Sequence, residues 1–88
     1  MIKIFAFKYK QIGQKIAYYR KLKSLTQKEF ARRLNISEST LGKIECGKYN
    51  NNIPLSILLS IAKELKIDLA MLVSFDEREK DLEINWFW

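Results

Sequence analysis

The sequence predicts a single all-α domain of five helices, and three observations support this class. The chain has 88 residues, enough for one hydrophobic core and too few for a second domain. Hydrophobic residues make up 48% and charged residues 30% of the chain, which is typical of a globular protein and argues against disorder. Between residues 11 and 74, apolar residues recur mainly with the period of a helix.

The first helix is predicted from Gln11 to about Ser24. Ile12, Ile16 and Tyr19 recur at helical spacing and would face the core, while lysines occupy other faces of the same segment. This spacing predicts an amphipathic helix with a basic outer surface.

The second helix starts at Thr26, because Thr26 and Glu29 have the spacing of a capping box. Leu25 before the cap and Phe30 within the helix are spaced for a hydrophobic staple, which would fix the direction of the incoming chain. Asn35 then interrupts the apolar pattern, and asparagine tolerates the left-handed conformation better than most residues. We therefore expect a tight turn between two helices at Asn35.

Three more helices follow. Ser37 is a good N-cap for the third helix, and Gly47 is a good C-terminal cap. Pro54 suits the first position of a fourth helix, and Asp68 would cap a short fifth helix from Leu69 to Ser74. The fourth helix would lie at the centre of the core because its apolar residues are numerous: Leu55, Leu58, Leu59, Ile61, Ala62 and Leu65.

The two ends of the chain show a period of two. Ile2, Ile4 and Ala6 alternate in an N-terminal extension, residues 1–10, and apolar residues also alternate in a C-terminal tail, residues 75–88. Because a lone strand needs a partner, we expect these segments to pair with each other or with those of a second chain. Alternatively, the tail lays its tryptophans on the core of residues 11–74. The predicted dimerisation residues are Leu82, Ile84, Trp86 and Trp88.

The charge distribution indicates a polyanionic partner. The chain has a net charge of +6, but residues 1–48 hold twelve basic and three acidic residues, whereas residues 49–88 hold four basic and seven acidic ones. Such a concentration of positive charge is typical of a nucleic-acid-binding surface, although a solvated face can have the same composition.

The composition also excludes several chemistries. The chain has no histidine and one cysteine, Cys46, which excludes an intrachain disulfide and a histidine-based triad and argues against a zinc site. The longest apolar run is too short to span a bilayer, and the N-terminus lacks the features of a secretory signal. We expect a cytoplasmic protein that is not an enzyme and that uses no metal, cofactor or membrane.

Two short helices joined by a turn, after a basic amphipathic helix, have the organisation of a helix-turn-helix DNA reader. On the third helix, one stripe lies opposite the inward-facing Leu41 and Ile44 and is free to enter a major groove. An ordinary surface helix would tolerate the same residues. The stripe consists of Glu38, Ser39, Gly42, Lys43 and Cys46.

From Ile12 to about Val73, the chain resembles the phage-repressor-like (XRE-type) helix-turn-helix regulators. The resemblance implies a five-helix, lambda-repressor-like domain that binds a two-fold operator in double-stranded DNA as a homodimer. Two positions depart from the usual pattern: Ser24 stands where members often have glycine, and Gly42 lies inside the third helix. The matching segments include Leu25-Thr26-Gln27, Phe30-Ala31, Ile36-Ser37, Thr40-Leu41, Ile44-Glu45, Gly47-Lys48 and Leu58 to Lys63.

The resemblance also implies roles for single residues. Gln27 matches a position that grips a phosphate, while Arg20 and Glu45 match an ion pair between the first and third helices. Glu38, Ser39 and Lys43 match base-facing positions. The complete set of DNA-binding residues that we predict is Gln27, Ser37, Glu38, Ser39, Thr40, Gly42, Lys43, Lys48, Tyr49 and Asn50.

Together these observations predict a sequence-specific transcriptional regulator, either a repressor or a controller of the restriction-modification type. The alternative is an antitoxin that represses its own operon and whose C-terminal tail binds a protein toxin. The sequence does not separate these functions.

Overall fold

Five helices form the part of the chain that the structure, a computed structural model, describes: residues 2–49 and 52–74. They are α1 (Ile2–Leu22), α2 (Gln27–Leu34), α3 (Glu38–Glu45), α4 (Leu55–Leu65) and α5 (Ala70–Val73). No strand occurs among these residues, and the predicted all-α class is confirmed. None of these helices has the length and apolar character needed to cross a membrane.

The prediction of a strand in residues 2–7 is wrong, because α1 is one continuous helix of 21 residues that begins at Ile2. The alternation of Ile2, Ile4 and Ala6 covers too few residues to outweigh helix formation. Lengthening an existing helix fixes only one residue for each new hydrogen bond, and no proline or glycine interrupts the chain before Gly13. The C-terminal half of the predicted pairing, at residues 82–88, lies outside the described residues.

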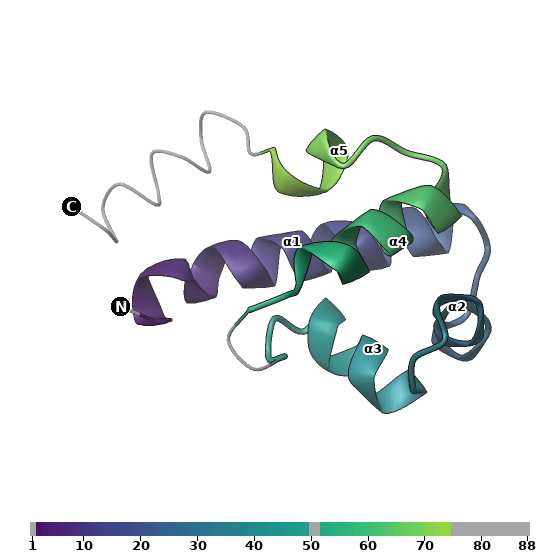
Figure 1. Ribbon diagram of the computed structural model, residues 1–88, viewed down its shortest axis with the longest axis horizontal. Coiled ribbons are helices and arrows are strands. Elements are labelled where there is room, and N and C mark those ends of the chain that lie inside the picture. Colours follow the sequence, from purple (N-terminus) through teal and green to yellow (C-terminus); the bar gives the residue numbers. More distant parts are fainter. Residues whose placement is uncertain (1, 50–51, 75–88) are drawn as a thin grey trace.

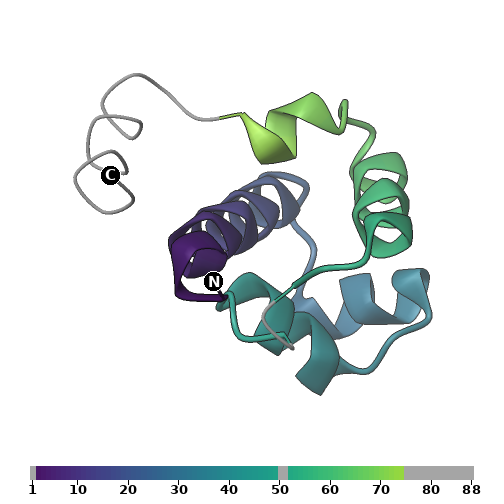
Figure 2. The same ribbon diagram turned by 60° about the vertical axis from the view of Figure 1, so that its left-hand side comes forward.

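α1 is the longest helix, and the other helices are arranged around it (Figure 1). Figure 2 looks obliquely along α1 and shows α3 below it, α4 at its side and α5 above it. All five helices contribute fully buried side chains to one core: Ile16, Phe30, Leu41, Ile44, Ile61, Leu65 and Leu72.

The predicted beginning and end of α2 are confirmed. The backbone N–H of Glu29 donates to the Thr26 hydroxyl (3.1 Å), and the Thr26 N–H donates to the Glu29 carboxylate (2.9 Å), which completes the capping box. The hydrogen bond from the Thr26 backbone lowers the pKa of Glu29 below its usual value. Asn35 ends the helix in the left-handed conformation (φ 58°) and turns the chain towards α3.

The last two helices differ from the prediction at their ends. Pro54 takes the N-cap position of α4, one residue before the predicted one, and Lys66 ends that helix with φ 56°. α5 is shorter than predicted, and its N-cap is Leu69, which makes no side-chain capping bond. The proposed side-chain cap at Asp68 is therefore wrong. The backbone carbonyl of Asp68 instead accepts a hydrogen bond from the Met71 N–H (2.9 Å), so a backbone turn starts α5.

Gly13 lets the backbones of α1 and α3 approach each other closely. A Cβ at Gly13 would overlap the carbonyl oxygen of Ile44 and lie 2.6 Å from that of Glu45. Any side chain at this position would therefore force the two helices apart. Gly42, by contrast, would have no neighbour within 4 Å of an added Cβ, so packing within the described chain does not require glycine there.

These two glycines give a matched pair of stability predictions. Gly13→Ala should lower the free energy of unfolding by about 1–3 kcal/mol, because the added methyl group overpacks the contact between α1 and α3. Gly42→Ala should raise it by about 1 kcal/mol, because alanine is the better helix former and meets no obstacle. Urea unfolding followed by circular dichroism measures both changes. Equal midpoints for the two variants would contradict the proposed close approach at Gly13.

Candidate nucleic-acid interface

One side of α3 is turned to solvent. Glu38, Ser39, Lys43 and Cys46 are exposed and Gly42 is partly exposed, whereas Leu41 and Ile44 are fully buried on the opposite side. We call these five solvent-facing residues the outer face of α3. The face is small and polar near the beginning of the helix and cationic one turn later, and this matches the stripe predicted from the sequence.

The first turn of α3 is fixed by its own side chains. The Thr40 N–H donates to the Ser37 hydroxyl (2.9 Å), and that hydroxyl donates to the Thr40 hydroxyl (2.8 Å). The predicted N-cap at Ser37 is therefore confirmed. The hydrogen bonds between Ser37 and Thr40 hold the first turn of α3 in place. Contact of either residue with DNA remains a prediction.

A buried ion pair joins α1 to the end of α3, as the family resemblance implied. Arg20 Nε lies 2.6 Å from Glu45 Oε2, and Arg20 Nη2 donates to Glu45 Oε1 at 3.1 Å. Both side chains are less than a tenth exposed. Arg20 Nη1 also donates to the backbone carbonyl of Leu25 (2.7 Å), so the same guanidinium holds the segment that leads into α2.

Gln27 adds α2 to this network. Its Nε2 donates to Glu45 Oε1 at 2.8 Å, so Glu45 accepts hydrogen bonds from both Arg20 and Gln27. The sequence indicated a phosphate contact for Gln27 and gave no sign of this internal one. One amide hydrogen is committed to Glu45, and the second remains available for a phosphate. The network of Arg20, Gln27 and Glu45 fixes the angle between α3 and the helices behind it.

The turn after α3 brings further predicted residues near the outer face. Gly47 adopts φ 73°, as expected for a C-terminal cap, and the Lys48 N–H donates to the carbonyl of Lys43 (2.8 Å). The Lys48 side chain is exposed, whereas Tyr49 is partly buried against the core. Tyr49 therefore has a packing role beside any contact with DNA. Asn50 lies outside the described residues.

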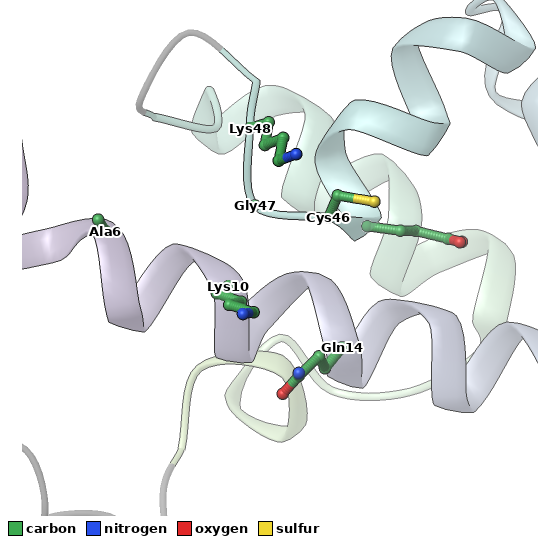
Figure 3. A pocket seen from close by; sticks show the side chains of 7 residues that line it. Ala6, Lys10, Gln14, Cys46, Gly47 and Lys48 are labelled. Carbon is green, nitrogen blue, oxygen red and sulfur yellow. The ribbon is translucent and has the colours of Figure 1, made fainter.

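Two residues that the sequence interpretation missed lie beside this turn. Lys10 and Gln14 are exposed on α1, and together with Cys46 and Lys48 they line a hollow between α1 and the end of α3 (Figure 3). The spacing of Lys10 and Gln14, four residues apart, would have placed them on one helix face. The predicted first helix begins at Gln11, whereas α1 runs through that boundary, so this signal was missed.

The site offers ligands for an anion rather than for a metal ion. Among residues 2–49 and 52–74, no group of three histidine, cysteine, aspartate or glutamate side chains is placed to hold a metal. The exposed polar groups around α3 are instead lysines, an amide, a hydroxyl and one carboxylate, which are groups that contact phosphates and base edges.

Comparison with known proteins agrees with this geometry. Residues 16–72 match the helix-turn-helix family HTH_3, a match that covers more than half of the chain. The chain belongs to the HTH_3 family. The members of this family are DNA-binding transcriptional regulators, so the XRE-type resemblance is confirmed.

The chain is also similar to three named regulatory proteins. An uncharacterised HTH-type transcriptional regulator of Methanocaldococcus jannaschii is 35% identical over 72% of this chain and 96% of its own length. The immunity repressor of Bacillus phage phi105 is 36% identical over 84% of this chain, which spans only 51% of that repressor. The crystal structure of the restriction-modification controller C.AhdI from Aeromonas hydrophila superposes with a TM-score of 0.71 at 26% identity, covering 77% of this chain and 96% of the controller.

The buried ion pair predicts a large effect of Arg20→Ala on stability. Removing the guanidinium leaves the Glu45 carboxylate buried without its charged partner, which should cost about 3–5 kcal/mol in the free energy of unfolding. Lys21→Ala, which removes an exposed charge from the next position of α1, is the control and should change it by less than about 0.5 kcal/mol. Chemical unfolding midpoints that coincide for the two variants would refute the structural importance of the pair.

Proposed function

We propose that the protein binds a specific two-fold DNA operator as a homodimer and regulates transcription by blocking or recruiting polymerase. One observation carries this proposal: the side of α3 that holds Glu38, Ser39 and Lys43 is exposed, while its other side is buried and fixed through Glu45. A helix held in this way can present the same side chains to every major groove that it meets.

Each residue of the outer face has a distinct proposed role. Lys43 donates to a guanine edge or to a phosphate, and Ser39 contacts a base edge. Glu38 accepts a hydrogen bond from cytosine N4, but its negative charge repels phosphates, so it increases specificity at the expense of affinity. Gln27 and Lys48 hold the DNA backbone. Gly42 has no side chain in the middle of the outer face, so the backbone of α3 can approach the bases there.

Exposed apolar residues on α4 support the proposed homodimer. Leu55 and Leu59, four residues apart on α4, are 60% and 50% exposed and lie on the same face of that helix. Exposed apolar side chains of this size are typical of surfaces that meet another protein. A second copy of the chain is the occupant that a two-fold operator requires.

The relatives favour a negative regulator or a controller. C.AhdI is named as a restriction-modification controller, and the phi105 protein is named as an immunity repressor. We propose the same kind of task here, in the cytoplasm and without catalysis. The alternative, an antitoxin that binds a toxin, depends on the tail at residues 82–88, and no observation on residues 2–49 or 52–74 favours it.

Selection of bound duplexes from a random DNA pool tests the proposal without assuming an operator. We expect enrichment of a palindrome whose half-sites are about one helical turn apart. Salt-sensitive binding to all sequences, with no enriched motif, would reject sequence-specific reading and leave only a basic surface.

Replacement of Lys43 tests the reading role of α3 directly. Lys43→Ala should weaken binding to the selected duplex and make the plot of log affinity against log salt concentration shallower by about one for a lost phosphate contact. Alternatively, if Lys43 contacts a base, Lys43→Ala should relax the sequence preference at that base and reduce the binding free energy by about 1–3 kcal/mol. Lys63→Ala removes the same charge from an exposed position on α4 and should change neither quantity. Binding by the Lys43 variant that matches wild type in affinity, salt dependence and sequence preference would exclude Lys43 from the interface.

A further inference from the structure

A second basic surface adjoins the outer face of α3 and comes from the N-terminal half of α1. Its hollow, of about 540 Å³, is lined by side chains from α1 and from the end of α3, including Lys10, Gln14, Cys46 and Lys48. Cys46, labelled in Figure 3, lines this hollow and also belongs to the outer face of α3, so the two surfaces share a residue.

The two walls of the hollow are held together by backbone contact. A Cβ at Gly47 would lie 2.6 Å from the Cα of Lys10 and 2.9 Å from its nitrogen, so the turn after α3 packs directly on α1 at Lys10. The left-handed conformation of Gly47 (φ 73°) sets the direction in which the chain continues to Lys48. The backbones that carry Lys10 and Lys48 are therefore fixed relative to each other and to α3.

The charge of the hollow suits an anion. Lys10 and Lys48 are both exposed, and neither forms an ion pair or hydrogen bond through its side chain with any residue in the described ranges. The single carboxylate on the lining, Glu45, is already neutralised by Arg20 and bonded by Gln27, so its charge opposes an incoming anion only weakly. The Gln14 amide adds a hydrogen-bond donor one turn of α1 beyond Lys10.

The position of the hollow indicates which anion it would meet. It adjoins Cys46, which lies at the opposite end of the outer face from Glu38. Cys46 follows Glu38 by eight positions, a rise of about 12 Å along the helix. When α3 lies in a major groove, the groups beyond the end of its outer face meet the phosphate backbone that borders the groove. The 21-residue α1 contains six basic residues and no acidic one, so its field attracts the same backbone.

We propose that Lys10, Gln14 and Lys48 form a phosphate-binding site for the DNA backbone that flanks the bases read by α3. This inference rests on the proposed operator-binding function. It assigns the N-terminal half of α1, which the sequence alone would set aside as an extension, to the DNA interface. The site adds affinity and fixes the register of the protein on the duplex without reading any base.

Variants of Lys10 test this site on the full chain and on the duplex obtained by selection. Lys10→Gln should make the dependence of log affinity on log salt concentration shallower by about 0.9 for each protein copy bound. In a phosphate-ethylation interference assay, ethylation of one phosphate outside the selected bases should weaken binding of the wild-type protein. The same ethylation should not weaken binding of the Lys10→Gln variant. Lys10→Arg keeps the charge and should retain both signals, and Lys63→Gln on α4 is the charge-matched control.

The outcomes separate this inference from the function on which it rests. If wild type selects a specific duplex but Lys10→Gln retains its salt dependence and its interference pattern, the phosphate site is refuted and operator reading stands. If Lys10→Gln and Lys63→Gln reduced the salt dependence of binding equally, the site would also be refuted, because the change would then reflect only the total charge of the protein. If wild type selects no duplex, both the function and the site are overturned.

Discussion

The arrangement of the DNA-binding surface depends on one buried carboxylate. Glu45 lies at the last position of α3 and accepts hydrogen bonds from Arg20 on α1 and Gln27 on α2, while Arg20 also holds the Leu25 carbonyl before α2. A buried ion pair contributes little net stability when compared with a well-packed apolar pair, but it is intolerant of losing one partner. Its effect here is therefore geometric, because the network links α1, α2 and α3 through one carboxylate.

Close backbone packing complements this polar network. Gly13 brings α1 against the carbonyls of Ile44 and Glu45, and Gly47 brings the following turn against Lys10. Both contacts lie at the C-terminal end of α3, beside Glu45, so that end is held by charge and by shape together. The other end is held by the Ser37 cap, whose partner is Thr40 within α3 itself. The helix is thus fixed at both ends, and the exposed residues between them, Ser39 and Lys43, are free to differ.

Local signals made much of this structure predictable from the sequence. The capping box at Thr26 and the turn at Asn35 depend on residues within a few positions, and the apolar spacing of Leu41 and Ile44 identifies the buried side of α3. The ion pair of Arg20 with Glu45 was accessible only through family resemblance, because 25 positions separate the partners. Six residues of period two were too few to distinguish strand from helix at residues 2–7. The second partner of Glu45, at Gln27, carries no local signal, since it arises from packing between α2 and α3.

The fold separates the residues that hold α3 from those that can meet DNA. Leu41, Ile44 and Glu45 face inward and carry the packing, whereas Glu38, Ser39 and Lys43 make no tertiary contact that the fold needs among the described residues. Substitutions on the outer face can therefore change sequence preference with little effect on stability, since exposed positions usually contribute less than about 0.5 kcal/mol. Gly42 tolerates at least a methyl group, because no atom in the described chain lies within 4 Å of a Cβ added there. A scaffold of this kind can acquire a new operator by changing a few exposed side chains, while backbone phosphates, which are the same in every sequence, are left to lysines on neighbouring elements.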